Sequence, residues 1–189
     1  MRSGEAAWIN ILLILSLLHD TVSTRSQSMD KIASFQVDHL RLKPGLYVSR
    51  KDKFSDVVLT TFDLRFKEPN KEPVIDQPAL HTIEHLGATF LRSHKVWDSK
   101  TVYFGPMGCR TGFYVILEGS YESTDVIPLL LEMFDWVEKF QGDIPGASAA
   151  ECGNWRDQNL DMAKWECRRY AAYLRNPKKE NLEYPSSMV

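Results

Sequence analysis

The chain has 189 residues, of which 43% are apolar and 25% are charged, the balance of an ordinary globular domain. Lysine and arginine number 23 against 25 aspartates and glutamates. The chain therefore lacks the excess of basic residues that would indicate nucleic acid or an anionic membrane as a partner. Three widely spaced cysteines, at positions 109, 152 and 167, do not form a disulfide scaffold. They favour a reducing compartment, so we expect a cytoplasmic protein.

The start of the chain carries an apolar stretch at residues 6–18. It is too short to span a membrane, and polar residues interrupt it. It resembles the core of a signal peptide, although the segment that follows offers only a loose cleavage site. We interpret residues 1–28 as an N-terminal extension ahead of a true start at Met29, with export through a signal peptide as the alternative. Residues 29–189 are then expected to form one domain.

The first predicted elements are a strand and a helix. Residues 53–66 are rich in β-branched and aromatic side chains and partly alternate, which predicts a half-buried strand. Three prolines between residues 68 and 78 then predict a loop. Asp76 is a candidate N-cap for a helix that reaches about residue 94, with Pro78 in its first turn. Apolar residues recur along it at helical spacing: Leu80, Ile83, Leu86, Phe90 and Leu91.

Two further strands are predicted at residues 100–104 and 111–118. A glycine-bounded turn with the sequence GPMGCRTG joins them and exposes Cys109 at its centre. A second helix, capped by Ser123 or Thr124, is expected to run to about residue 140. Its predicted buried face carries Val126, Leu130, Phe134 and Val137.

The last part of the chain is a long loop followed by a helix. Residues 141–157, rich in glycine, proline and alanine, form the loop and contain Cys152, and the helix is expected over residues 160–174. The strands and helices mix without a regular βαβ alternation. The predicted fold class is therefore α+β, a two-layer sandwich in which a mainly antiparallel sheet packs against helices.

The motif HTIEH lies on the first helix. Residues four apart share a helix face, so His81 and His85 can bind one cation, with Glu84 at the edge of that site. A catalytic metal needs a third protein ligand and an open position, and Cys152 is the best candidate because an irregular loop can bring its thiolate to the helix. Two imidazoles and a thiolate suit zinc or ferrous iron. The alternative is a pair of solvent-facing histidines and a loop cysteine without a partner.

The other cysteines and histidines have different settings. Cys109 lies in a tight turn next to Arg110, where backbone amides and a cation favour a thiolate that acts as a base or nucleophile. The alternative is a packed free cysteine. Cys167, at helical register, is expected in or near the core. His39 and His94, taken singly, are more typical of structural or solvent-facing histidines.

Five ordered segments together resemble a known family. They are ASFQVDH at 33–39, FDLRFKEPN at 62–70, LHTIEHL at 80–86, GPMGCRTGFY at 105–114 and ECGN at 151–154. In order and spacing they are similar to the LuxS family of S-ribosylhomocysteine lyases. The resemblance covers nearly all of the chain from Met29 to the last helix.

The resemblance implies a LuxS-like fold and a homodimer with two active sites at the subunit interface. It implies one divalent metal per subunit, Fe²⁺ natively with Zn²⁺ as a substitute. The small-molecule substrate would be S-ribosylhomocysteine. The products would be L-homocysteine and 4,5-dihydroxy-2,3-pentanedione, the precursor of the quorum-sensing signal autoinducer-2.

Matching the motifs residue by residue implies three groups of site residues. The metal ligands are His81, His85 and Cys152. The acid/base pair is Glu84 and Cys109. The substrate contacts are Ser34, His39 and Arg65, some of them from the partner subunit.

The chain departs from the family's usual pattern at three positions. Family members often carry a histidine where this chain has Gln158, and many carry an aspartate and a serine where it has Tyr103 and Gly105. These differences concern residues around the ligands rather than the ligands themselves.

Two other functions share some of these features. A zinc peptidase with an HxxEH helix uses its glutamate to activate a metal-bound water, but it needs a larger chain and a downstream carboxylate as third ligand. A non-catalytic, metal-stabilised binding module would tolerate replacement of both Glu84 and Cys109.

Overall fold

The computed structural model describes residues 32–185. The extension assigned to residues 1–28, and the alternative of a signal peptide there, lie outside the described residues. Residues 33–185 belong to one compact unit. Within the described range, every helix is too short or too polar to cross a bilayer.

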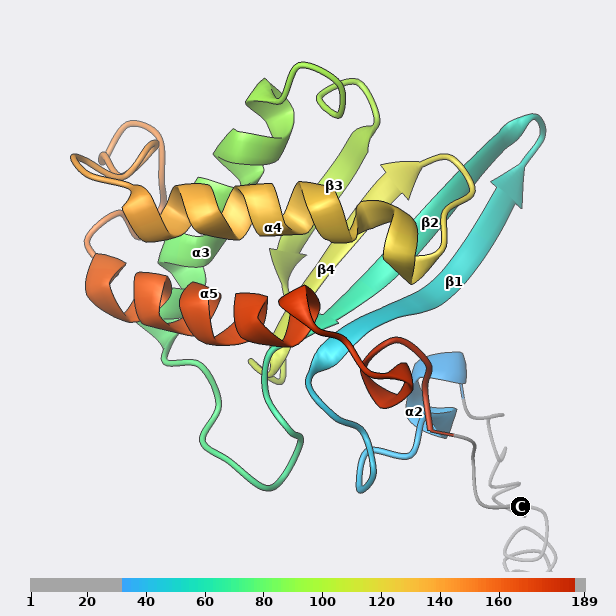
Figure 1. Cartoon of the computed structure of the whole chain (residues 1–189). Coiled ribbons are helices and arrows are strands. Elements are labelled where there is room, and N and C mark those ends of the chain that lie inside the picture. Colours follow the sequence, from blue (N-terminus) through green and yellow to red (C-terminus); the bar gives the residue numbers. More distant parts are fainter. Residues whose placement is uncertain (1–31, 186–189) are drawn as a thin grey trace, which may run out of the picture. The chain divides into compact units, whose positions relative to one another are not determined.

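A four-stranded antiparallel sheet forms one layer (Figure 1). Its strands are β1 (Gly45–Phe54), β2 (Val57–Arg65), β3 (Thr101–Pro106) and β4 (Gly112–Glu118). Their order across the sheet is β1-β2-β4-β3, and each neighbouring pair is antiparallel. The predicted α+β class with an antiparallel sheet is confirmed.

The prediction of a single strand over residues 53–66 is wrong at its start. Lys53 and Phe54 end β1, which pairs with β2 from Phe54 opposite Val57. The turn between them contains Ser55 in the left-handed conformation, with φ at 55°. The outer half of β1 is largely charged and exposed, so it lacks the apolar alternation by which half-buried strands are recognised.

The helices begin and end close to their predicted positions. They are α3 (Gln77–Ser93), α4 (Ser123–Lys139) and α5 (Leu160–Arg175), with a short α2 (Ala33–Gln36) and a 3-10 turn (Lys179–Asn181) that were not predicted. The carboxylate of Asp76 accepts a hydrogen bond from the backbone N–H of Ala79 at 3.3 Å and caps α3 as expected.

The predicted cap of α4 is wrong. Glu122 is the N-cap, and its backbone N–H donates to the carboxylate of Asp125 at 2.8 Å. Ser123 is already inside the helix and buried, and its hydroxyl is directed at the carbonyl of Leu182. The buried face of α4 is confirmed, because Val126, Leu130, Phe134 and Val137 are all in the core.

The three long helices cover one face of the sheet (Figure 1). Phe62 and Leu64 of β2 and Phe113 and Val115 of β4 join the helices in one core, which removes apolar surface from water. Phe66, just after β2, stacks on Tyr170 of α5 with ring centroids 4.0 Å apart. The ammonium of Lys67 pairs with the carboxylate of Glu166 at 2.6 Å, both buried. These contacts fix α5 against the end of β2.

The opposite face of the sheet, which we call the open face, carries the alternate side chains. They are Leu59, Thr61, Asp63 and Arg65 of β2 and Tyr114 and Ile116 of β4. No helix from α3 to α5 contributes to it among residues 32–185. Residues 35–39 and Tyr184 lie against the end where Asp63 and Arg65 are buried. The rest of the face stays partly exposed, at Leu59, Tyr114 and Ile116.

Candidate active site and metal centre

Three predicted ligands meet at one point. His81 and His85 project from the same face of α3, and Cys152 reaches them from the loop between α4 and α5. The Nε2 atoms of the two histidines are 3.0 Å apart, and the sulfur of Cys152 is 3.4 Å from Nε2 of His81. The three ligand atoms all lie within 4.8 Å of one another. We call these residues the ligand cluster.

The loop that supplies Cys152 also orients both imidazoles. Nδ1 of His85 is 2.7 Å from the carbonyl oxygen of Pro145, and Nδ1 of His81 is 2.9 Å from that of Asp157. A carbonyl can only accept, so both Nδ1 atoms carry their hydrogen and both Nε2 lone pairs point into the cluster. Two imidazole nitrogens that face each other at this distance need either a shared proton or a metal ion between them.

The donor set fits a first-row transition metal. Two ligands about 2.05 Å from a tetrahedral ion are separated by about 3.3 Å, close to the observed spacing. Imidazole nitrogen and thiolate sulfur suit zinc or ferrous iron, whereas calcium and magnesium prefer oxygen. The third donor is sulfur rather than the carboxylate of a zinc peptidase. The ligand cluster is therefore a possible metal site with a position left for substrate.

One glycine permits the loop to approach His85 so closely. Gly146 has φ of +71°, and a Cβ built on it would lie 3.2 Å from Nδ1 of His85. Any side chain there would be strained and would press on the imidazole. The Pro145–Gly146 pair marks a turn in the sequence, but the approach of this turn to His85 depends on tertiary packing.

Glu84 lies beside the cluster, as predicted. Its carboxylate is 3.9 Å from Nε2 of His85, and the side chain is 35% exposed. The carboxylate therefore lies next to the ligand cluster and remains accessible to solvent.

Cys109 lies in a different hollow, which we call the Cys109 pocket. This cavity of about 300 Å³ opens on the open face of the sheet, at the turn between β3 and β4. Its lining includes Phe35, Val37, His39, Asp63, Arg65, Cys109, Tyr114 and Tyr184. Two predicted substrate contacts, His39 and Arg65, thus line one cavity with the predicted acid/base cysteine. Ser34 falls within α2, and its side chain is outside the description.

A relay of hydrogen bonds reaches the Cys109 sulfur. Nη1 of Arg65 donates to the hydroxyl oxygen of Thr111 at 2.6 Å, and that oxygen is 3.0 Å from the sulfur. The Thr111 oxygen accepts from Arg65, and its own hydrogen can be donated to the sulfur when Cys109 is a thiolate, which has no hydrogen of its own. Burial raises the pKa of the Cys109 thiol, but the Thr111 hydrogen bonds and the Arg65 charge outweigh it and lower the pKa overall. The cation is Arg65 rather than the adjacent Arg110 of the prediction.

Asp63 holds Arg65 in place. Its two carboxylate oxygens accept from Nε and Nη2 of Arg65 at 3.1 and 2.5 Å, and it also accepts from the Tyr184 hydroxyl at 2.9 Å. Burial raises the pKa of Asp63, while its contacts with Arg65 and Tyr184 oppose that shift. The sequence analysis missed Asp63 and Thr111. Spacing of two along a strand places Asp63 and Arg65 on one face, the only signal available.

Thr111→Val is expected to raise the pKa of the Cys109 thiol, since it removes the hydroxyl hydrogen bond and keeps the side-chain shape. The thiolate is then lost at higher pH than in the parent, and iodoacetamide labelling of Cys109 at neutral pH slows several-fold. Peptide mass spectrometry across a pH series measures this. Thr101→Val, at a buried threonine bonded to the carbonyl of Trp97, should leave the profile unchanged. An unshifted profile in Thr111→Val would refute the relay.

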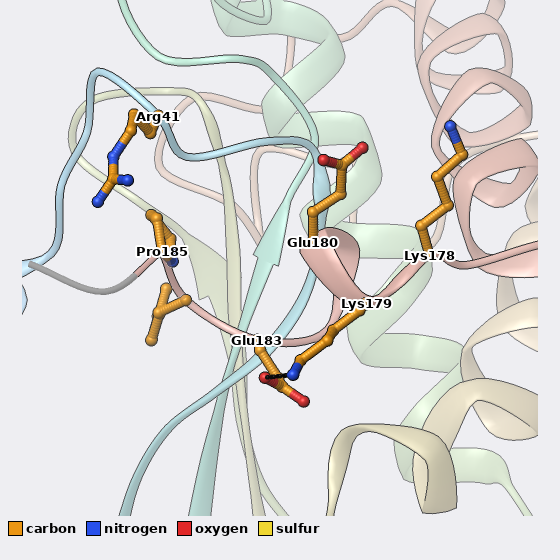
Figure 2. Close-up of a pocket in the computed structure, with 7 residues that line it drawn as sticks. Arg41, Lys178, Lys179, Glu180, Glu183 and Pro185 are labelled. Carbon is orange, nitrogen blue, oxygen red and sulfur yellow. Dashed lines mark ion pairs between the residues drawn. The ribbon is translucent and has the colours of Figure 1, made fainter.

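The structure does not bring the predicted acid/base pair together within one chain. Neither Glu84 nor any member of the ligand cluster lines the Cys109 pocket in the described part of the chain. A larger hollow of about 690 Å³ shares Tyr184 with the Cys109 pocket. Arg41 and Lys178 also line it (Figure 2). It holds an ion pair of Lys179 with Glu183 at 3.4 Å and no ligand or nucleophile of the site. The predicted site residues thus lie in two separate groups in this chain, the ligand cluster with Glu84 and the Cys109 pocket.

The structure thus combines an α+β fold with a possible metal site, made by two helix histidines and a loop cysteine, and with a cysteine of lowered pKa at a strand turn. A family model for S-ribosylhomocysteinase (LuxS) matches residues 32–181. The chain belongs to the LuxS family.

Curated relatives agree with the family assignment. The S-ribosylhomocysteine lyase of Clostridium acetobutylicum is 59% identical over 157 residues, which cover 83% of this chain and 99% of the relative. That of Borrelia garinii subsp. bavariensis is 58% identical, over 83% of this chain and all of the relative. That of Desulfotalea psychrophila is 58% identical over 159 residues, 84% of this chain and all of the relative.

Proposed function

We propose that this protein is a metal-dependent lyase that cleaves S-ribosylhomocysteine to L-homocysteine and 4,5-dihydroxy-2,3-pentanedione. The observation that carries the proposal is the ligand cluster of His81, His85 and Cys152 in a chain of the LuxS family. Relatives that match this chain over 99% and 100% of their own length bear the name S-ribosylhomocysteine lyase.

The reaction explains why such a site is needed. A thioether leaves a sugar only when a carbonyl lies next to the carbon that loses a proton, so the carbonyl of the ribose must first migrate from C1 through C2 to C3. Each shift removes the proton from the carbon next to the carbonyl and returns it to the former carbonyl carbon, while the hydroxyl proton moves from one oxygen to the other. Loss of the thiolate from C5 by β-elimination then releases homocysteine. No oxidant, reductant or organic cofactor is consumed.

The residues divide this work between them. A divalent cation, when bound by His81, His85 and Cys152, supplies Lewis-acid polarisation of the sugar oxygens. The Cys109 thiolate is suited to removing the carbon-bound protons, because Thr111 and Arg65 lower the pKa of its thiol. Glu84 is suited to moving protons on the oxygens. Arg65 and His39 line the pocket that receives the substrate, with Ser34 as a further contact.

The active enzyme is proposed to be a homodimer in which each active site joins two half-sites. The first half-site is the ligand cluster with Glu84 from one subunit, and the second is the Cys109 pocket from the other. The open face of the sheet is only partly covered within residues 32–185, and the Cys109 pocket opens on it. A second copy on this face would bury Leu59 and Ile116 and could bring its ligand cluster to the pocket. In a two-fold symmetric dimer the same surfaces of both subunits meet, so both active sites would form together.

The metal proposed for the cell is Fe²⁺, with Zn²⁺ as a substitute, since both suit the donor set. The lack of a dense disulfide framework supports a cytoplasmic location, with export as the alternative if residues 1–28 are a signal peptide. The five-carbon product is proposed to serve as the autoinducer-2 precursor. Neither nucleic acid nor a membrane is proposed as a partner.

The activity is tested by incubating anaerobically purified protein with S-ribosylhomocysteine and reading free thiol with a chromogenic disulfide. Stoichiometric release of homocysteine is expected. Removing the metal with a chelator should abolish release, and adding Fe²⁺ or Zn²⁺ should restore it. Release that survives complete metal removal would contradict the metal-dependent mechanism, and peptide hydrolysis in place of thiol release would favour the peptidase.

A further inference from the structure

The amide of Gln158 links a predicted metal ligand to the body of α3. Its Nε2 lies 3.2 Å from Nδ1 of His81, and its Oε1 lies 2.7 Å from the hydroxyl oxygen of Thr82. Thr82 is buried one residue after His81, and its hydroxyl oxygen also accepts from the backbone N–H of Asn159, the cap of α5, at 2.9 Å. Gln158 therefore sits where the loop, α3 and α5 meet.

When the nitrogen of the Gln158 amide faces the imidazole of His81, the surrounding donors and acceptors cannot all be paired. Nδ1 of His81 donates its hydrogen to the carbonyl of Asp157 at 2.9 Å, so an amide N–H on the same atom sets two donors against each other. Thr82 has one hydroxyl hydrogen but faces two acceptors, the carbonyl of Pro78 at 2.9 Å and Oε1 of Gln158.

A half-turn of the amide removes both conflicts with almost no change of shape. The oxygen of Gln158 then accepts from Nδ1–H of His81, which it shares with Asp157. The nitrogen of Gln158 donates to the hydroxyl oxygen of Thr82. The single hydroxyl hydrogen of Thr82 is left for the carbonyl of Pro78. Each donor in this network then faces an acceptor.

We propose that Gln158 is a positioning residue that holds His81 in the tautomer and orientation that a bound metal requires. An oxygen acceptor on Nδ1–H keeps the hydrogen there, presents the Nε2 lone pair to the cluster and raises its basicity. Thr82 fixes which end of the amide faces the ring. The inference rests on the proposed metal site. Because the acceptor is a neutral amide, a carboxylate in its place should hold the metal more tightly.

The rate of Zn²⁺ release from the zinc-loaded full chain, followed with a chromogenic chelator, tests this role. Gln158→Leu, which keeps the size but removes the acceptor, is expected to release Zn²⁺ about 10-fold faster than the parent. Gln158→Glu should release it more slowly than the parent. Gln141→Leu and Gln141→Glu, at an exposed glutamine of the same loop, make the same changes away from His81 and should match the parent.

A second readout follows the proton itself. NMR of the zinc-loaded protein with labelled histidine should detect the Nδ1 proton of His81 in the parent and in Gln158→Glu. That proton should exchange with solvent faster in Gln158→Leu. A packing role alone would weaken both Gln158 variants without this difference between them.

The proposal is overturned if Gln158→Leu releases Zn²⁺ at the parent's rate, or if Gln158→Glu releases it as fast as Gln158→Leu. Should Gln158→Leu fail to fold, the comparison of Gln158→Glu with the parent still decides, because only slower release agrees with the proposal. A parent chain that binds no Zn²⁺ would refute the metal site as well. Tight binding with equal rates in all variants would refute only the role of Gln158.

Discussion

Cys109→Ala and Glu84→Gln are each expected to abolish homocysteine release while the metal content stays near that of the parent. Neither residue belongs to the ligand cluster, so the metal should remain bound. Each is proposed to move protons in every carbonyl shift, and general acid/base groups typically contribute 10² to 10⁴ in rate. We therefore expect losses of at least about 10²-fold, measured by thiol release and by metal analysis of the same samples.

The three cysteines of the chain provide matched controls. Cys152→Ala removes a ligand and should lose both metal and activity, whereas Cys167→Ala, in the buried core, should keep both apart from some loss of stability. Loss of metal in both Cys109→Ala and Glu84→Gln would show that their roles are assigned wrongly. Full activity in both would favour a metal-stabilised binding module.

Mixing the two inactive variants is expected to restore activity. If each active site combines Glu84 of one subunit with Cys109 of the other, a heterodimer of Glu84→Gln and Cys109→Ala contains one site with both changes and one with neither. Such a heterodimer, purified with two different tags, should show about half of the parent's activity. The expected change is large, because each homodimer is inactive on its own.

The same experiment can contradict the proposed assembly. An inactive heterodimer would place Glu84 and Cys109 of one active site in the same subunit, and a monomer in solution would refute the interface site altogether. Exchange between two samples of Cys109→Ala with different tags is the control, since it forms mixed dimers without an intact site. Any activity there would come from contamination.

Much of the first half-site could be predicted because it is local. Asp76 and Pro78 start α3 where they were expected to, and a helix places residues four apart on one face whatever surrounds it. His81, His85 and the nearby Glu84 followed from that rule. The buried faces of α3 and α4 could be read from helical periodicity in the same way.

The second half-site was less accessible to sequence reasoning. Cys109 was predicted at an exposed turn, but Arg65, whose charge helps to lower its pKa, comes from another strand, where Arg65 and Asp63 are held by pairing of β2 with β4. Strand β1 was missed in part because its outer half is charged. Pairing between distant strands depends on register, which no short window of sequence contains.

The sequence by itself determined which reactive side chains the site could use. They are two imidazoles on one helix face, a cysteine at a glycine-bounded turn and another cysteine in a long loop. These are properties of short segments, governed by backbone geometry and side-chain type. Only the tertiary structure decided that Cys152 meets His81, that Thr111 and Arg65 lower the pKa of Cys109, and that Glu84 lies apart from the Cys109 pocket. Those relations depend on packing between segments far apart in the chain, which is fixed by the shared core and not by any one segment.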